Sequence, residues 1–191
     1  PQGDPQLILT KIEDYSRSVE ELRADATQLG QSCEQCDMEA PQFSHLQELE
    51  DDIARTRQSW GRYGEFATAK KEIADRDWLS IRTKLYDVEE FLQHWQEDVK
   101  SRGGAAKDPV SVMLLHNLDK YRKCLPFLKF VRGDGWENTH WLQLFSILKF
   151  PTKGPNAVKV ENLTLGHFLD KAEILAEKAE EVKHLRAQAQ G

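Results

Sequence analysis

Apolar residues recur along this sequence at alternating intervals of four and three, the feature that most restricts its fold. Within the first thirty residues the row consists of Ile8, Ile12, Tyr15, Val19, Leu22, Ala26 and Leu29. Side chains at this spacing share one face of an α-helix and pack lengthwise against a partner helix. The pattern therefore predicts a long helix that ends near Gly30.

The same spacing returns twice before residue 100. After a polar stretch at residues 31–41, a second row, interrupted at Thr56 or Arg57, consists of Leu46, Leu49, Ile53, Trp60, Tyr63 and Ala67. A third row runs without a break through Trp78, Ile81, Leu85, Val88, Leu92, Trp95 and Val99. Three long helices joined by short polar links predict an elongated, antiparallel bundle of spectrin-like character.

A polar link with two glycines, SRGGAAK at residues 101–107, separates these rows from the rest of the chain. Directly after it, Asp108 is suited to cap a helix and Pro109 to occupy its first turn. The helix that begins there should stop before Pro126, because proline disrupts a helix interior. Its apolar side should carry Val112, Leu115 and Leu118.

Two further helices are expected near the end of the sequence. Asn138 or Thr139 can cap a short helix that runs through Leu148 and is ended by Pro151. Residues 152–161 should form a loop, with one extended piece at residues 157–160. Thr164 should open a last helix with one apolar side, formed by Leu165, Phe168, Ala172, Leu175, Ala179 and Val182. The predicted fold class is therefore all-α.

Charge is distributed unevenly along the chain. The net charge of −6 is the sum of −10 over residues 1–100 and +4 over residues 101–191. Binding of nucleic acid requires a concentrated basic face, which neither half has, so nucleic-acid partners are not expected. The absence of an initiator Met at Pro1, together with the end at Gly191 directly after a helical pattern, suggests a piece of a larger chain.

The cysteines and the lack of a long apolar run bear on the compartment. Three cysteines, an odd number, and no apolar signal segment suggest a reducing, intracellular setting. No run approaches the roughly 20 apolar residues that cross a bilayer, so membrane insertion is not expected. In that setting the glycosylation pattern at Asn162 and the adhesion tripeptide at residues 132–134 lose most of their meaning. The tripeptide is more simply interpreted as a turn, with Gly133 and Gly135 supplying permissive dihedral angles.

The residues that could perform chemistry form no recognisable catalytic pattern. Cys33 and Cys36 have the CxxC spacing, but a structural zinc site needs two more ligands and only His45 lies near in sequence. The other histidines lie on different predicted helices without metal-ligand spacing. No phosphate-binding glycine loop is present. Hence no catalytic, cofactor-binding or metal-binding residue is assigned, and this stretch is not expected to be an enzyme.

The tryptophans instead predict structural positions. Trp60, Trp78, Trp95 and Trp141 fall on or beside the apolar rows, where large rings bury much area and dominate core packing. His140, beside Trp141, is interpreted as a helix-start residue packed against its neighbours rather than as a catalytic base. A chain with core aromatics, long helices and no polar pocket is suited to hold a shape or transmit force.

From about Trp60 onward, the order of these residues resembles the second N-terminal region of dynein heavy chains. The resemblance rests on Trp60, Trp78-Leu79, Trp95-Gln96, Tyr121, Leu125-Pro126, Leu128, His140-Trp141, Leu144, Thr164-Leu165-Gly166 and Leu169. The pair His140-Trp141 and the later Thr164-Leu165-Gly166 are its most specific parts. Residues 1–55 are similar only in being helical and heptad-like. Among dyneins, LPFLKFVRGDGWENTHWLQLF and HLRAQAQG are most similar to the heavy chains of intraflagellar transport.

The resemblance implies a mechanical role without catalysis in this stretch. It implies a segment of a minus-end-directed microtubule motor, in which the cargo-binding tail meets the linker that swings over the AAA+ ring. The core residues implied are Trp60, Trp78, Trp95, Leu125, Pro126, His140, Trp141, Leu144, Leu165 and Phe168. ATP and magnesium would bind only in other parts of the motor, which would be an ATPase.

The resemblance also implies partners and a location. The partners would be the rest of the heavy chain, a second heavy chain, the intermediate and light-intermediate chains, and proteins of the intraflagellar transport train. The location would be the cytoplasm and the microtubules of the cilium or flagellum, including the basal body and axoneme.

These implications predict three parts of the chain. Residues 1–100 would be an acidic long-helix bundle at the tail, residues 101–108 a flexible link, and residues 109–191 the first helical part of the linker. Gly103 and Gly104 are the candidate hinge, since paired glycines allow large dihedral changes. The alternative function is a spectrin-like adaptor that binds partner proteins through the acidic hairpin of residues 1–100.

Overall fold

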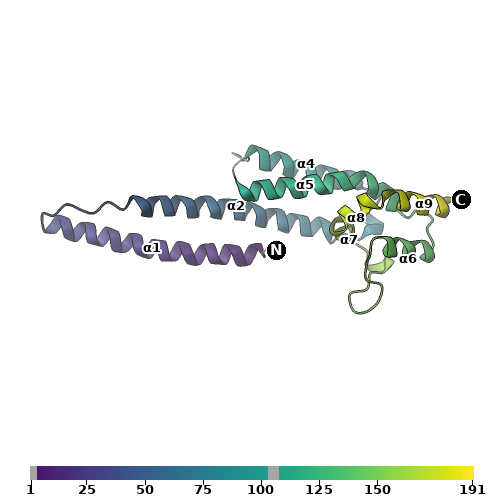
Figure 1. Ribbon diagram of the computed structural model, residues 1–191, viewed down its shortest axis with the longest axis horizontal. Helices are drawn as coiled ribbons and strands as arrows, with labels where there is room; N and C mark the ends of the chain where they lie inside the picture. The colour runs from purple at the N-terminus through teal and green to yellow at the C-terminus, as the bar shows by residue number, and fades with distance from the viewer. Residues whose placement is uncertain (1–3, 103–107) are drawn as a thin grey trace. The chain divides into compact units, whose positions relative to one another are not determined.

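The structure is a computed structural model that describes residues 4–102 and 108–191. It divides into two compact units, unit 1 at Pro1–Ala67 and unit 2 at Thr68–Gly191. In the described residues, all the elements are α-helices or short 3-10 helices, and the only β-type pairing is an isolated bridge between Asp77 and Thr164 (Figure 1). The all-α prediction is therefore confirmed.

Unit 1 is a hairpin of two long helices. Helix α1, Pro5–Gln35, runs antiparallel to the first part of α2, Ser44–Ala74 (Figure 1). Asp4 caps α1 by accepting a hydrogen bond from the Gln6 N–H. Ion pairs join the helices: Arg23 Nε lies 2.6 Å from Glu50 Oε1, and Arg57 Nε lies 3.0 Å from Glu13 Oε1.

Helix α1 ends five residues after the predicted stop at Gly30. It passes through Gly30 and closes at the following cysteine pair, where the Met38 N–H donates to the Cys33 carbonyl at 2.8 Å. Asp37, directly before Met38, has a left-handed φ of 54°. This bonding pattern is the usual termination of a helix by a left-handed residue, and aspartate adopts that conformation more easily than most residues.

The hairpin covers only part of the apolar row predicted on α1. Ile12, Ser16 and Val19 are buried, whereas Tyr15, Leu22 and Leu29 are exposed. The row thus consists of two strips on neighbouring parts of the helix surface. Within unit 1, the strip that contains Ile12 and Val19 is the one that packs.

Unit 2 begins with the end of α2 and continues through α3, Trp78–Ile81, and α4, Leu85–Ser101. The sequence predicted one unbroken helix over residues 78–99, and the structure divides it at residues 82–84. Asp77 caps α3 by accepting the Ser80 N–H at 3.0 Å, and a second helix starts at Leu85. The predicted apolar face is nevertheless correct, since Trp78, Ile81, Leu85, Val88, Leu92 and Val99 are all buried.

Helix α5, Pro109–Leu128, packs beside α4 (Figure 1). As predicted, Asp108 caps α5, accepting the N–H groups of Val110 and Ser111 at 3.3 and 3.2 Å. Arg122 Nη1 donates to Gln96 Oε1 across the two helices at 2.7 Å. The link at residues 101–108 therefore joins two helices of one compact unit, whereas the sequence-based division used it to separate two parts of the chain. The candidate hinge, Gly103 and Gly104, lies outside the described residues.

The predicted stop of α5 before Pro126 is wrong. The helix passes through Pro126 to Leu128 and continues into a 3-10 turn, η1, at Lys129–Val131. Pro126 itself is exposed, while Cys124 and Leu128 on either side are fully buried. Burial of these flanking side chains offsets the hydrogen bond that proline cannot donate.

The remaining helices are α6, Asn138–Ile147; α7, Leu165–Asp170; α8, Ala172–Glu177; and α9, Ala179–Gln190. The last predicted helix is divided at Lys171 and Lys178, but its six predicted apolar residues are all buried. Residues 157–160 form no strand: the loop ends in a 3-10 turn, η2, at Val160–Asn162. No helix within residues 4–102 and 108–191 combines the length and apolar character that crossing a bilayer would require.

Candidate functional site

Three of the predicted core residues, Trp78, Trp141 and Phe168, belong to a chain of aromatic rings in unit 2. Five buried rings form a row in which each ring contacts the next, and we call this row the aromatic junction: Trp141, Phe145, Phe150, Phe168 and Trp78. The successive ring centroids are 6.3, 5.7, 6.1 and 4.5 Å apart. These separations are typical of favourable aromatic pairs. The junction therefore connects α6, Phe150 in the turn that follows it, α7 and α3.

Trp78 ties three separate segments together. Its indole Nε1–H donates to the buried carbonyl of Val131 at 3.0 Å, and its backbone N–H donates to the Leu163 carbonyl at 2.8 Å. Its side chain is fully buried against Phe168. A single residue of α3 is thus fixed to the turn after α5 and to the start of α7.

The tripeptide Arg132-Gly133-Asp134 belongs to the support of the junction. Gly133 is buried with a φ of +72°, and a Cβ built on it would lie 2.1 Å from Cζ2 of Trp141. Arg82 Nη1 donates to the Arg132 carbonyl at 2.7 Å and lies 3.7 Å from Asp134 Oδ1. The turn expected from the sequence is therefore present, and Trp141 requires one of its glycines.

The segment Thr164-Leu165-Gly166 packs against the end of α2. The Leu165 N–H donates to the Arg76 carbonyl at 3.1 Å, next to the isolated bridge that involves Thr164. A Cβ on Gly166 would lie 3.1 Å from Cβ of Ala74, which is a tight contact. Leu165 is fully buried.

Two histidines cap helices through their side chains. The Glu137 N–H donates to Nδ1 of His140 at 3.1 Å, and the Thr164 N–H donates to Nδ1 of His167 at 3.0 Å. Each histidine satisfies the N-cap N–H that the helix itself leaves without a partner. His140 is therefore a helix-start residue, as the sequence suggested, although Glu137 rather than Asn138 or Thr139 is the N-cap.

The other predicted core residues lie outside the junction. Trp60 is half-buried in unit 1, with its ring centroid 5.5 Å from that of Tyr63. Trp95 and Leu125 are half-buried in unit 2, and Pro126 is exposed and so not part of the core. Leu144, by contrast, is fully buried in α6.

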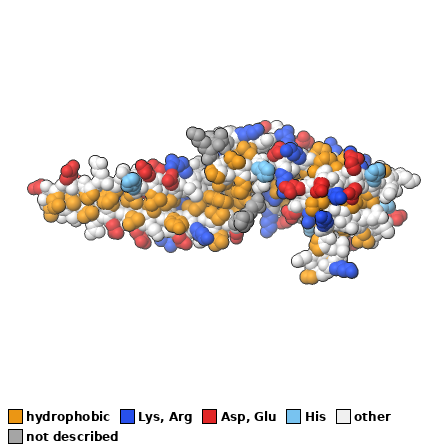
Figure 2. All heavy atoms as spheres, viewed as in Figure 1, with side chains coloured by type: hydrophobic (Ala, Val, Ile, Leu, Met, Phe, Trp, Pro, Cys, Tyr) orange, Lys and Arg blue, Asp and Glu red, His pale blue; other side chains and the backbone are white. Residues whose placement is uncertain are grey.

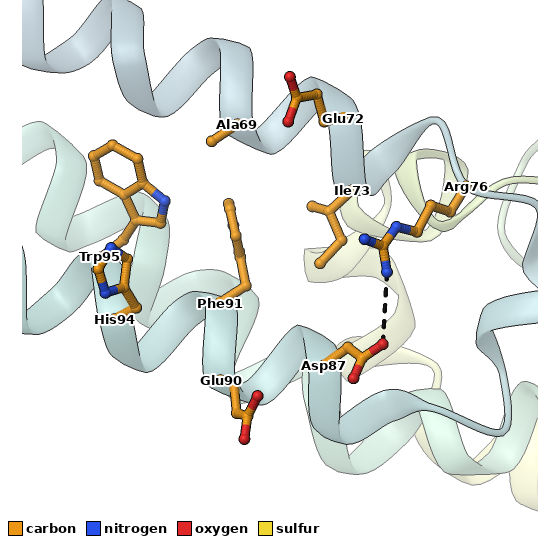
Figure 3. A pocket seen from close by; sticks show the side chains of 9 residues that line it. All are labelled: Ala69, Glu72, Ile73, Arg76, Asp87, Glu90, Phe91, His94 and Trp95. Atoms are coloured by element: carbon orange, nitrogen blue, oxygen red, sulfur yellow. Dashed lines mark ion pairs between the residues drawn. The ribbon is translucent and has the colours of Figure 1, made fainter.

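A groove that the sequence did not indicate lies between the end of α2 and α4 in unit 2. Its volume is about 400 Å³, and Figure 3 shows Ala69, Glu72, Ile73, Arg76, Asp87, Glu90, Phe91, His94 and Trp95 around it. Arg76 Nη1 lies 3.5 Å from Asp87 Oδ2 at one end. The floor is mostly apolar and the charged groups lie at the edge, so the groove is suited to contact a side chain rather than to perform catalysis.

The cysteines show no reactive or metal-binding arrangement. Burial raises the pKa of Cys124 to about 12, which keeps its thiol protonated and unreactive. Cys33 is half-buried and Cys36 exposed, and all three are free. In the part of the chain that the structure describes, no group of three or more His, Cys, Asp or Glu side chains could hold a metal ion.

Sequence reasoning missed Phe145, Phe150 and Gly133 as parts of this site. Phe145 follows Trp141 by one helical turn, which is a usable signal. Phe150 lies in a turn after the helix and Gly133 in an exposed-looking tripeptide. Only their tertiary contacts distinguish them from ordinary loop residues.

Comparison with known proteins agrees with the resemblance in the sequence. The family model described as dynein heavy chain, N-terminal region 2, matches residues 46–191. Cytoplasmic dynein 2 heavy chain 1 of Chlamydomonas reinhardtii is 42% identical over 192 residues, covering 100% of this chain. The proteins of the same name from Homo sapiens and Caenorhabditis elegans are 33% and 27% identical, covering 94% and 100% of this chain. Similarity to these relatives thus extends to residues 1–45, and the chain spans 4% of the length of each relative.

Proposed function

The chain belongs to the dynein heavy chain family, in N-terminal region 2, and from this premise we propose that it is a non-catalytic mechanical segment of a microtubule motor. In this proposal it connects a cargo-binding tail to the linker that swings over the AAA+ ring. The motor is minus-end-directed and works in retrograde intraflagellar transport. The names of the similar heavy chains support the choice of dynein 2.

The observation that carries the mechanical proposal is the aromatic junction of unit 2. A segment that transmits displacement must resist bending, and close-packed interiors deform little. In the junction, Phe150 joins the rings of α6 to the ring of α7, which contacts Trp78 of α3, and Trp78 also donates a hydrogen bond to the turn after α5. Elements far apart in the sequence are thereby joined into one stiff body.

The whole motor is part of the same proposal. Its ATP and magnesium sites lie in modules outside these residues, and its partners are the AAA+ ring, the tail, a second heavy chain and the intermediate and light-intermediate chains. Contacts with intraflagellar transport train proteins follow from the same assignment. The proposed location is the cytoplasm and the microtubules of the cilium or flagellum.

The experiment compares two glycine variants in the full-length heavy chain. Gly133→Ala disturbs the contact with Trp141, whereas Gly135→Ala changes a glycine of similar φ with no atom within 4 Å of the new Cβ. Microtubule gliding velocity and microtubule-stimulated ATPase rate are measured for both. We expect Gly133→Ala to slow gliding at least threefold while most of the ATPase rate is retained, and Gly135→Ala to change neither. Equal gliding by the two variants, with unit 2 shown to be loosened by hydrogen exchange, would contradict a role in force transmission.

The adaptor function is the second candidate, and the exposed strip of α1 is the observation that favours it. An adaptor needs an accessible apolar surface of its own, and Tyr15, Leu22 and Leu29 provide one. If the chain is an adaptor, the glycine variants should leave gliding unchanged. Substitutions in the exposed strip of α1 should instead abolish binding of a partner protein.

A further inference from the structure

Helix α1 carries an apolar row that the hairpin does not use. Tyr15, Leu22 and Leu29 repeat every seven residues, and their exposed fractions are 69%, 54% and 48%. The buried strip of Ile12 and Val19 lies on the neighbouring side of the same helix. A heptad row is the pattern with which one helix packs along another, so its exposure leaves a helix-binding surface open.

The shape of this surface fits a helix better than a small molecule. Figure 2 shows hydrophobic side chains gathered in a band along the hairpin of α1 and α2. The row from Tyr15 to Leu29 covers 15 residues of α1, a length of roughly 21 Å at 1.5 Å per residue. The hollow beside Tyr15, lined by Lys11, Asp14 and Ser18, is open and about 360 Å³ in volume. A long, shallow apolar strip is typical of binding an amphipathic helix.

The charge of unit 1 selects among possible partners. Residues 1–67 contain six Lys and Arg against fourteen Asp and Glu, a net charge of −8. Asp14, Glu21 and Asp25 follow the exposed row along its length on α1. A second copy would bring an equal negative charge to the contact, and an anionic membrane surface would also be repelled. A helix with basic flanks is attracted both by the net negative charge of unit 1 and by the carboxylates beside the exposed row.

We propose that the exposed row of Tyr15, Leu22 and Leu29 binds an amphipathic helix of a partner protein whose apolar face is flanked by Lys and Arg. The partner helix has at least about 15 residues, the length of the row at 1.5 Å per residue, and lies along α1 with its basic flanks beside Glu21 and Asp25. The proposal is independent of the mechanical role of unit 2, because it uses only residues of α1.

A direct test measures binding of a synthetic 25-residue helix to the 191-residue chain by fluorescence anisotropy. The probe has Leu at the two apolar heptad positions and Lys at the flanking positions, and a second probe has Glu in place of Lys. We expect Leu22→Ser to weaken binding of the Lys probe about tenfold or more. Ala24→Ser is the matched control, since it is exposed on another face of the same helix.

A charge-reversal variant tests whether the carboxylates of α1 attract the basic flanks of the probe. Asp25→Lys should weaken binding of the Lys probe and strengthen binding of the Glu probe. Added salt should weaken binding of the Lys probe to the unchanged chain but not binding of the Glu probe. Equal binding of both probes to the unchanged chain, or equal effects of Leu22→Ser and Ala24→Ser, would overturn the proposal. Circular dichroism confirms that each variant keeps its helix content.

The source of the natural helix is tested in the assembled motor. A photoreactive residue at position 22 is crosslinked in the full-length heavy chain within its complex, with position 24 as the control, and the attached peptide is identified by mass spectrometry. A crosslink at position 22 to a Lys- and Arg-rich helix of another polypeptide supports the proposal. A crosslink within the same heavy chain, a crosslink to a second copy of it, or no crosslink above the position-24 control overturns it.

Discussion

Gly133 lies directly beneath the indole of Trp141, so close that a Cβ at this position would be 2.1 Å from Cζ2 and 2.4 Å from Cη2 of the ring. The glycine also has a φ of +72°, which other L-residues adopt only with strain. The tripeptide that resembles an adhesion signal is thus shaped by core packing. The same contact explains why this turn and the following helix stay together in unit 2.

Two alanine substitutions separate the cost of this contact from the cost of the dihedral angle. Gly135→Ala has a φ of +76° but open space around the new Cβ, so we expect a loss of about 1 kcal/mol. Gly133→Ala has the same strain and a clash with a buried ring, so we expect a loss of about 3 kcal/mol or more. Urea unfolding followed by circular dichroism measures both. Similar losses would mean that the Trp141 ring moves aside easily.

At the same turn, we expect alanine substitutions of Trp141 and Asp134 to lower the free energy of unfolding by very different amounts. Truncating the nearly buried Trp141 to Ala should cost about 3 to 5 kcal/mol, since it removes a large core ring. Asp134→Ala removes an exposed carboxylate 3.7 Å from Arg82, and such pairs contribute about 0 to 1 kcal/mol. The free energies of unfolding of the two variants test this. A comparable loss for Asp134→Ala would show that its pair with Arg82 is a main support of the turn.

The hydrogen bond of Trp78 can be tested without emptying the core. Trp78→Phe retains an aromatic ring but leaves the buried Val131 carbonyl without its 3.0 Å partner, so we expect a loss of about 1 to 3 kcal/mol. Hydrogen exchange should then show faster exchange in the 128–136 turn than in α4. Trp60→Phe in unit 1 is the control, since Trp60 is only half-buried. Unchanged exchange in the turn would show that packing alone holds it to α3.

The sequence predicted the buried faces well from α3 to α4 and from α7 to α9, but less well on α1 and on α5, where the predicted Val112 is exposed. Helix ends were also predicted less well. The row from Trp78 to Val99 identified buried residues correctly, because periodicity depends on which side of a helix meets the core. It did not predict the division at residues 82–84, because the capping by Asp77 involves residues that would also fit inside a longer helix. At Pro126 the reverse happened, since burial of Cys124 and Leu128 kept a helix continuous past a residue that usually ends one.

The candidate site was predictable only in part, for a related reason. Trp78, Trp141 and Phe168 were identified because large apolar residues at helical spacing are usually buried. The joining of their rings through Phe150, and the fit of Trp141 over Gly133, depend on contacts between segments distant in the sequence. The heptad row on α1 predicted a packing partner, and unit 1 supplies it for Ile12 and Val19 but not for Leu22.

Cys124 provides a prediction that depends on pH. Burial raises the pKa of its thiol from 9.0 to about 12, so at pH 9 its thiolate fraction is roughly five hundredfold below that of a free thiol. Iodoacetamide should therefore label Cys33 and Cys36 in the folded chain and reach Cys124 only after denaturation, as mass spectrometry would show.

The unfolded Cys124 thiol releases its proton above about pH 9 whereas the folded one holds it to about pH 12, so rising pH in that window favours unfolding. Replacing the thiol by Cys124→Ala should remove this pH dependence while lowering stability at neutral pH. Rapid labelling of Cys124 in the folded chain at pH 8 would instead mean that α5 opens locally around it.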